Sequence, residues 1–210
     1  MEYLDRVTAI APDCLTTLKG NKPNFLKKGL AWKENYERNQ DSNRFKWGKF
    51  SRVNISELLV ESLGLISDQH CFYCDINRVI PMINRPEIDH FCPKTIRPIK
   101  AYYYPNLFLS CSSCNGNKSD KFDRKYLLNF TDPNYNFDDY YYIDFATGKV
   151  QTRTDIEFND RYKARYTLVV LGINKGARPK IRREELNAYN DSNNKNLADY
   201  SYRFFIRRAS

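Results

Sequence analysis

Two pairs of cysteines constrain this chain more than any other feature. Cys71 and Cys74 form one C-x-x-C pair, and Cys111 and Cys114 form a second, with 36 residues between the pairs. Two residues between cysteines let both sulfur atoms face one metal ion, and two such pairs complete a tetrahedral four-cysteine zinc site. We therefore predict that a structural zinc ion joins the two ends of this loop. The alternative is four unrelated cysteines in the core.

The remaining cysteines and one histidine lie outside these pairs. Cys14 and Cys92 have no C-x-x-C partner, and we expect them to pack as small hydrophobic side chains. His70 precedes Cys71, but four cysteines already fill a tetrahedral site, so we expect His70 beside that site or at the surface. Six cysteines in a chain expected inside the cell are more often thiols or metal ligands than disulfides.

Length and composition indicate a soluble, folded chain. The 210 residues are 41% hydrophobic and 28% charged, which excludes wholesale disorder and low-complexity classes. No apolar run approaches the roughly 20 residues of a membrane span. The first residues, MEYLDRVTAI, lack the basic and apolar regions of a signal peptide. We therefore expect a cytoplasmic protein without membrane contact.

The charge indicates an anionic partner. The formal net charge is +9 and the sequence pI is about 9.2, which favours nucleic acid. Residues 61–152 are nearly neutral, whereas residues 1–60 and 153–210 are basic. This distribution fits flanks that bind a nucleic-acid backbone around a catalytic middle. It fits equally well flanks that are only solvated helices.

Local patterns divide the chain into three regions of one integrated domain with α+β architecture. Residues 1–67 are expected to form a basic helical segment, residues 68–130 a zinc-stapled core, and residues 131–210 a hairpin with a basic helical segment. Asn54 and Glu57 fit a capping box ahead of apolar residues at helical spacing. The expected helices cover 25–38, 54–66, 115–118, 158–171, 180–189 and 195–208, and the expected strands cover 87–91, 106–111, 140–145 and 150–154.

Side chains suited to phosphodiester hydrolysis lie inside the zinc-stapled region. Asp89 and His90 are adjacent, Asn106 precedes the second cysteine pair, and Asn115 follows it. A histidine that titrates near neutrality can take a proton from water, and carboxylate and amide oxygens are hard ligands that suit Mg²⁺. Zinc binding would bring Asp89, His90 and Asn115 together. Activity should then fall as the pH drops through about 6.5, the usual pKa of histidine.

The strings EIDHFCPK and PNLFLSCSSCNGNK resemble the HNH motif of the ββα-metal, or His-Me finger, endonucleases and its zinc-binding cysteines. The resemblance in the motif covers about Cys71–Lys118. It implies a ββα-metal core in which His90 is the general base and Asn106 steadies the loop and orients that histidine. It also implies that Asp89 and Asn115 hold a catalytic Mg²⁺ or another divalent cation, while the cysteines hold structural zinc.

Outside the motif, the layout is more weakly similar to the HNH subunits of Septu-type anti-phage systems, including those attached to retrons. A helix leads into the first cysteine pair, and the segment DPNYNFDDYYYIDFATGKV is followed by a helix that ends in LGIN. The resemblance implies an antiviral defence role with an ATPase partner. Members often carry Glu-His at the catalytic pair, whereas this chain has Asp89–His90, whose shorter acid changes the reach of the ligand oxygen.

Other polar and aromatic residues keep two interpretations. Lys94 and Lys118 either contact substrate phosphate or are merely exposed. Asp138, Asp139 and Asp144 are expected to solvate a Tyr-rich hairpin rather than to hold a second metal ion. The 16 tyrosines and 13 phenylalanines could stack on unpaired bases, although most should lie in the core.

The sequence therefore favours a metal-dependent endonuclease that hydrolyses phosphodiester bonds, with DNA as the favoured substrate and structured RNA such as tRNA as the other. The alternative is a non-catalytic zinc module that binds nucleic acid or a protein partner. Such a module would have no use for Asp89, His90 and Asn115 together. A subunit that stays inactive until its ATPase partner docks is compatible with the endonuclease.

Overall fold

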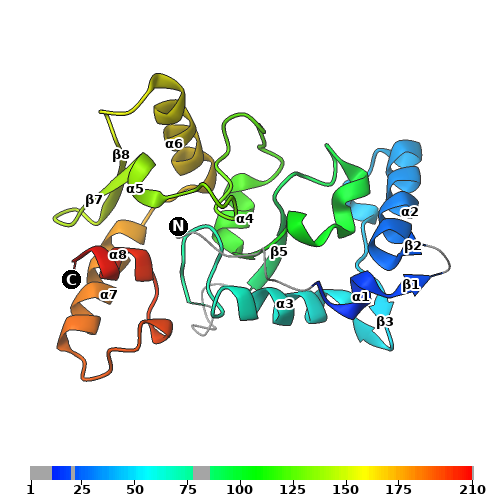
Figure 1. Ribbon diagram of the computed structural model, residues 1–210, viewed down its shortest axis with the longest axis horizontal. Coiled ribbons are helices and arrows are strands. Elements are labelled where there is room, and N and C mark those ends of the chain that lie inside the picture. The colour runs from blue at the N-terminus through cyan, green and yellow to red at the C-terminus, as the bar shows by residue number, and fades with distance from the viewer. Residues whose placement is uncertain (1–10, 20–21, 78–85, 210) are drawn as a thin grey trace.

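The computed structural model describes residues 11–19, 22–77 and 86–209 (Figure 1). Within these ranges, helices are joined by four separate two-stranded antiparallel sheets. This mixture of helices and small sheets agrees with the predicted α+β class. None of the helices in the described ranges is both long enough and apolar enough to span a bilayer.

A helical N-terminal part leads into a central strand–strand–helix unit, and a C-terminal part arranges helices around a hairpin (Figure 1). The elements are α1 (Asp13–Thr16), β1 (Leu18–Lys19), β2 (Lys22–Pro23), α2 (Asn24–Asn39), η1 (Ser42–Arg44), β3 (Lys49–Phe50), β4 (Val53–Asn54), α3 (Ile55–Ile66), β5 (Pro86–His90), η2 (Pro98–Tyr102), η3 (Tyr104–Asn106), β6 (Leu107–Cys111), α4 (Ser112–Lys118), α5 (Phe137–Tyr140), β7 (Tyr141–Asp144), β8 (Lys149–Thr152), α6 (Phe158–Leu171), α7 (Arg178–Asp191), η4 (Leu197–Asp199) and α8 (Arg203–Ala209).

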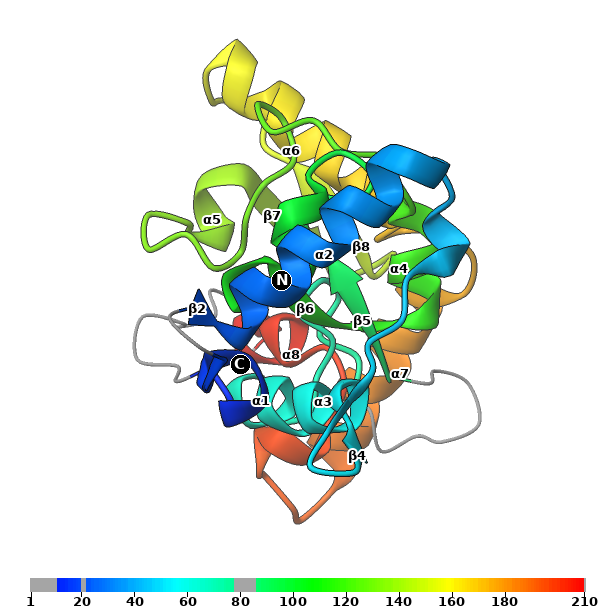
Figure 2. The same ribbon diagram turned by 90° about the vertical axis from the view of Figure 1, so that its right-hand side faces the viewer.

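The helix α2 packs against η2, a short helix in the connection between β5 and β6 (Figure 2). Gly29 permits this approach, because a Cβ atom at that position would collide with the backbone carbonyl of Ile99. Trp32 of α2 is buried and meets the ring of Phe45 edge-on, with 5.1 Å between ring centroids. The predicted helix over residues 25–38 is confirmed, and it extends one residue further at each end.

The helix α3 begins where the sequence predicts, although its cap differs. Asn54 is the N-cap residue, but its side chain accepts no hydrogen bond from the helix backbone. Instead, the Asn54 amide donates to the Glu57 carboxylate at 2.6 Å, so the two residues of the expected capping box bond to each other. The apolar stripe behaves as predicted, since Ile55, Leu59 and Leu63 are all fully buried.

The centre of the molecule is an antiparallel strand pair followed directly by a helix. In the register of β5 and β6, Asp89 lies opposite Phe108 and His90 lies opposite Leu107. Every residue of β6 is buried, as its apolar sequence predicts. Cys111 ends β6 and is also the N-cap residue of α4, so the second cysteine pair lies at the junction of strand and helix.

The C-terminal part agrees with the prediction up to α7. The strands β7 and β8 form the expected hairpin, and α6 has the predicted bounds. Gly172 ends α6 with a left-handed backbone, φ 60°, which glycine adopts at little cost. The predicted helix over residues 195–208 is wrong, because only η4 and α8 form there. Tyr202 interrupts it at φ 58°, and its backbone N–H donates instead to the Asp75 carbonyl at 2.7 Å.

One hydrophobic cluster runs through all three regions of the chain. It includes Leu15 near the N-terminus, Phe108 in the central strand pair and Phe205 in the last helix. Cys14 and Cys92 are both buried, in agreement with the expected role as small hydrophobic side chains. The paired cysteines belong to the same cluster, so the candidate metal centre lies inside the core rather than on a peripheral loop.

Candidate metal centre and active-site pocket

The four paired cysteines come together in one buried cluster. The sulfur atoms of Cys71, Cys74, Cys111 and Cys114 all lie within 4.8 Å of one another. Backbone N–H groups point at two of them, from Cys111 to the Cys71 sulfur at 3.3 Å and from Cys114 to the Cys111 sulfur at 3.4 Å. The predicted clustering is confirmed, and the alternative of four unrelated core cysteines is wrong.

The donor set and its surroundings suit a zinc-type ion. Four thiols within reach of one point are the ligands of a structural four-cysteine zinc site. Burial opposes ionisation of Cys71, yet hydrogen bonds from the three other cysteines hold its pKa well below the usual value. Burial raises the pKa of Cys114, so a metal ion that binds here must displace protons from thiols of the cluster.

Arg178, the first residue of α7, supplies positive charge beside the cluster. Its guanidinium donates to the Cys114 sulfur at 3.2 Å and to the carbonyl of Gly172 at 2.7 Å. Burial lowers the pKa of Arg178, but the neighbouring cysteine sulfurs outweigh that effect and raise it. Four thiolates around Zn²⁺ carry net negative charge, which Arg178 would partly neutralise. No periodicity or motif in the sequence singles this arginine out.

His70 and Arg203 tie the first cysteine pair to the C-terminal part. His70 is fully buried, not at the surface, and its ring nitrogens contact the carbonyls of Asp68 at 2.6 Å and Tyr200 at 2.8 Å. Arg203 of α8 bonds to the Asp75 carboxylate at 2.6 Å, one residue after Cys74. These contacts hold the segment that carries the first pair against residues more than 120 positions away.

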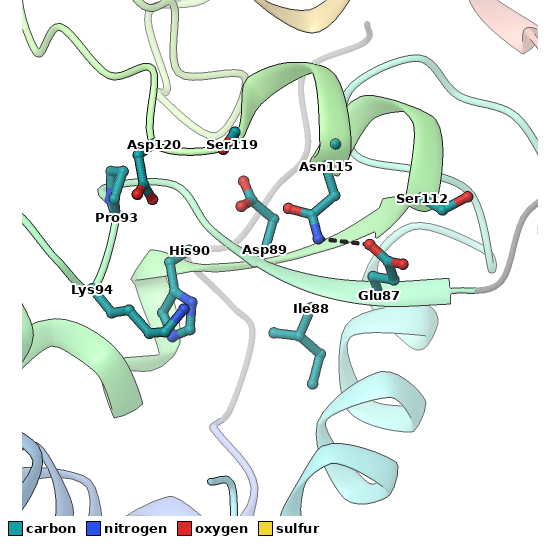
Figure 3. A pocket seen from close by; sticks show the side chains of 11 residues that line it. Glu87, Ile88, Asp89, His90, Pro93, Lys94, Ser112, Asn115, Ser119 and Asp120 are labelled. Atoms are coloured by element: carbon teal, nitrogen blue, oxygen red, sulfur yellow. Dashed lines mark hydrogen bonds between the residues drawn. The ribbon is translucent and has the colours of Figure 1, made fainter. Parts of the chain in front are cut away.

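A pocket of about 380 Å³ lies between β5, α4 and the loop that follows β5 (Figure 3). It contains the residues that the sequence singled out as catalytic, His90, Asp89 and Asn115, together with Lys94. The remaining lining residues are Glu87, Ile88, Pro93, Ser112, Gly116, Ser119 and Asp120. Asn106 and Lys118 do not line the pocket; they hold parts of its wall from behind.

The His90 imidazole is held in one orientation with one hydrogen position. Its Nε2 lies 2.9 Å from the carbonyl of Ala101, which can only accept, so Nε2 carries the hydrogen and Nδ1 keeps a lone pair. The Trp47 ring stacks on the imidazole, with 5.4 Å between centroids and 3° between planes. Burial lowers the pKa of His90 to about 3, and Lys94 and Lys118 act in the same direction. The ring is therefore neutral near pH 7, with the Nδ1 lone pair left free by the Nε2 contact.

Asn106 fastens the loop that orients His90. Its side-chain oxygen accepts from the backbone N–H of Cys92 at 2.8 Å, and its nitrogen donates to the Cys92 carbonyl at 3.0 Å and to the Lys100 carbonyl at 3.3 Å. Lys100 directly precedes Ala101, whose carbonyl contacts His90. Asn106 thus acts on the histidine through the backbone and touches no part of the pocket.

Asp89 is occupied by two partners. Tyr73 donates its hydroxyl hydrogen to one carboxylate oxygen at 2.5 Å, and the Lys118 ammonium lies 2.9 Å from the same oxygen and 3.2 Å from the other. Burial raises the pKa of Asp89, although Lys118 opposes that shift. Lys118 is 0% exposed, so the interpretation that it is merely a surface lysine is wrong. Asp89 could meet a metal ion only by exchanging or sharing this ammonium group.

Glu87 is a pocket residue that the sequence reasoning missed. Its carboxylate accepts from the Asn115 amide nitrogen at 2.6 Å, so the Asn115 side-chain oxygen faces the Asp89 side of the pocket (Figure 3). Alternation along β5 was the available signal, because residues 87 and 89 of one strand point to the same face. An amide oxygen and two carboxylates therefore meet at the junction of β5 and α4.

Two of the acids expected to solvate the hairpin have protein partners. Asp138 pairs with Arg208 at 2.8 Å, and Asp144 accepts from the backbone N–H of Thr147 at 3.1 Å. Within the described part of the chain, no group of three or more His, Cys, Asp or Glu other than the four cysteines is close enough to hold a metal ion. No protein-family model matches this chain, and no curated protein matches it either.

Proposed function

We propose that this protein is a metal-dependent HNH endonuclease that hydrolyses phosphodiester bonds, with the ββα-metal core formed by β5, β6 and α4. The observation that carries the proposal is His90. It is a neutral, oriented imidazole in the wall of a polar pocket, at the strand end next to the cysteine-bound helix. In a structural histidine both ring nitrogens face protein groups, as in His70.

In this mechanism His90 takes the proton from the attacking water. Its neutral state provides the lone pair at Nδ1, and the Ala101 carbonyl stabilises the charged ring that forms, because the Nε2 hydrogen bond strengthens when the imidazole gains a proton. Lys94, in the pocket wall with its ammonium 5.4 Å from the ring centroid of Phe45, is available to a phosphate oxygen. Asn106 keeps the histidine in place through Lys100 and Ala101.

A divalent cation such as Mg²⁺ would neutralise the charge that develops on the phosphoryl and leaving oxygens. The Asn115 side-chain oxygen and Asp89 would be the ligand pair that the motif implies, with Lys118 displaced or shared at Asp89, and hard oxygen donors suit this ion. The Glu87 carboxylate fixes the direction of the Asn115 amide. The four-cysteine cluster lies in the core rather than in the pocket, which fits a structural role for zinc.

The defence role and the ATPase partner belong to the same proposal and rest on the sequence resemblance. We expect a stable complex with an ATPase subunit, contacted mainly outside residues 71–118, because the pocket must stay open to nucleic acid. Light scattering on the co-expressed pair should give one species larger than either chain. Two separate species would remove the partner from the proposal and leave the endonuclease intact.

The endonuclease proposal is tested by comparing the cleavage rate of His90→Ala with that of the wild type. Purified wild-type protein, with and without the ATPase subunit, is incubated with plasmid DNA and with total RNA in the presence of Mg²⁺. We expect His90→Ala to lower the cleavage rate by about 10²–10⁴-fold, the usual contribution of a general base. Zinc content and circular dichroism should match the wild type. A variant that cleaves at the wild-type rate would favour the non-catalytic zinc module.

A second arm separates the base from the metal ligand. Asn115→Ala should raise the Mg²⁺ concentration needed for half-maximal activity, and excess Mg²⁺ should restore part of the rate. Excess Mg²⁺ should not restore His90→Ala, because a missing proton acceptor is not replaced by more cation. Equal rescue of both variants would contradict the assignment of His90 as the base.

A further inference from the structure

The outer face of α6 carries exposed aromatic rings interleaved with arginines. Phe158, Arg161, Tyr162 and Arg165 recur at helical spacing, so they share one side of the helix. Phe158 is 69% exposed and Tyr162 is 47% exposed, and both arginines are exposed. Soluble proteins rarely leave large rings in such a contiguous arrangement unless the surface meets a partner.

The segment between α4 and α5 extends the same surface. Tyr126 packs against Tyr162 with 4.5 Å between ring centroids, and Tyr162 stacks on Tyr166 at 6.5 Å with 16° between ring planes. The Lys125 ammonium lies 5.1 Å from the centroid of the Tyr126 ring. We call this surface the aromatic stripe, and its members are Lys125, Tyr126, Phe158, Arg161, Tyr162, Arg165 and Tyr166.

Packing on the opposite side fixes which way the stripe faces. Ala164, Thr167 and Leu171 of α6 are fully buried. The Thr167 hydroxyl accepts from the backbone N–H of Leu128 at 3.0 Å, which locks the rotation of the helix. The stripe therefore cannot turn into the core without breaking these contacts, so its rings face outward.

The charge on the stripe is positive. The helix α6 contains Arg161, Lys163 and Arg165 against one acid, Asp160, and that acid is already paired with Lys163 at 2.7 Å. Asp123 in the neighbouring loop accepts from the backbone N–H of Lys125 at 2.8 Å. Arg161 and Arg165, with no acid paired to either among the described ion pairs, are thus the charges that an approaching ligand meets.

The helix also connects the stripe to the candidate active site. Its C-terminal end meets α4, where Lys175 donates to the Asn117 side chain at 2.9 Å, two residues from Asn115 of the pocket. From there α6 extends outward to the edge of the molecule (Figure 1). The part of α6 that carries the stripe, residues 158–166, spans about 12 Å at 1.5 Å per residue, enough for two or more nucleotides.

We propose that the aromatic stripe is a docking surface for an unpaired strand of nucleic acid. The proposal rests on the endonuclease proposed above and names the form of substrate that it engages. Flat rings bind bases of any sequence by stacking, but only where a base face is unpaired, and guanidinium and ammonium groups beside them bind the phosphates. Nucleic acid is favoured over a protein partner by charge, because exposed Arg161, Arg165 and Lys125 lie beside the rings and the one acid of α6, Asp160, is already paired with Lys163.

The test measures binding by a protein that does not cut. In a His90→Ala background, fluorescence anisotropy compares Phe158→Ala/Tyr162→Ala with the parent on a 20-nucleotide single strand, as DNA and as RNA, and on the matching duplexes. Stacking on one base corresponds to about a 5- to 150-fold change in affinity, so loss of two rings should weaken single-strand binding at least tenfold. Duplex binding should change much less. Tyr142→Ala is the matched control, because Tyr142 is 49% exposed but lies on β7.

Arg161 and Arg165 are tested separately, by the salt dependence of single-strand binding. Arg161→Gln/Arg165→Gln should flatten the dependence of log affinity on log salt for the single strand by about 1.4, since each phosphate contact contributes roughly 0.7. An unchanged slope together with unchanged affinity for Phe158→Ala/Tyr162→Ala would overturn the proposal. Equal weakening by Tyr142→Ala would overturn it too, because the effect would not belong to the stripe.

Failure of this inference is distinguishable from failure of the endonuclease. If the wild type cleaves nucleic acid and Phe158→Ala/Tyr162→Ala binds and cleaves single strands equally well, the stripe is not a nucleic-acid surface although the nuclease stands. If the wild type cleaves nothing but the double variant loses single-strand binding, the stripe stands and the nuclease fails. Retained nucleic-acid binding with loss of an ATPase subunit would assign the stripe to a protein.

Discussion

The buried pair of Lys118 and Asp89 makes a strong prediction about stability. Lys118→Met keeps the length and most of the volume of the side chain but removes the ammonium group that lies 2.9 Å and 3.2 Å from the Asp89 oxygens. Asp89 is only 6% exposed, and among the described residues Tyr73 remains as a donor to its carboxylate. Removing one member of a buried ion pair costs about 3–5 kcal/mol. That is a large part of the roughly 5–15 kcal/mol stability of a typical domain.

The loss of folding stability in Lys118→Met should depend on pH in a defined direction. Burial raises the pKa of Asp89 and Lys118 opposes that shift, so loss of Lys118 raises the pKa further. The folded variant then holds a proton that the unfolded chain releases more easily. Its deficit relative to the wild type is therefore largest above the folded pKa of Asp89 and shrinks as the pH falls through it.

Urea unfolding followed by circular dichroism, in buffer with a fixed free zinc concentration, measures this deficit. Lys121→Met is the matched control, because Lys121 lies three residues further on, is exposed, and donates only to the Asn117 carbonyl. We expect the control to stay within about 0.5 kcal/mol of the wild type. In Asp89→Asn/Lys118→Met, the combined loss should be smaller than the sum of the single losses. A Lys118→Met protein within about 1 kcal/mol of the wild type at neutral pH would refute the ion pair as described.

Three further predictions concern the metal, the base and the pocket. Elemental analysis should find one zinc per chain, and Cys71→Ser or a strong chelator should unfold the central region, because structural zinc supplies on the order of 10 kcal/mol in small fingers; folded protein without zinc would contradict this. The acid limb of the kcat/KM profile should lie far below pH ~6.5, the usual histidine pKa, because burial lowers the pKa of His90 to about 3. Trp47→Ala exposes the imidazole and should move that limb to higher pH. A wild-type limb near pH ~6.5 would show that the ring is solvated. Glu87→Ala should raise the Mg²⁺ concentration needed for activity without changing zinc content, because the Asn115 amide is then free to turn; unchanged Mg²⁺ dependence would argue against this orienting role.

The pH prediction shows where sequence reasoning met its limit. The residue type of His90 indicated a pKa near ~6.5, but the pKa in the protein depends on the rings around the imidazole. Trp47 and Phe45 come from a segment more than 40 residues earlier, and Ala101 comes from the connection between the strands. No local pattern records that these three residues meet, so burial and the direction of the shift emerge only from the folded chain.

The sequence by itself determined the features that depend on residues close together in the chain. The C-x-x-C spacing predicted the metal cluster because two residues between cysteines set the reach of both sulfurs. Apolar periodicity predicted α3, since a helix repeats its face every three to four residues, and a short apolar run predicted the buried strand β6. The strand predicted over residues 87–91 contains Asp89 and His90, and the structure ends that strand at His90.

Only the tertiary structure decided how distant side chains share charge and hydrogen bonds. The sequence left Lys118 as either a phosphate contact or an exposed lysine, but it is enclosed by Asp89 and the backbone of β5. Arg178 meets the cysteine cluster from 64 residues away, and Tyr202 breaks an otherwise helical segment by bonding to Asp75. The physical reason is the same in each case. A buried charge or backbone group takes whichever partner the packed core brings within about 3 Å, and that partner is chosen in space rather than along the chain.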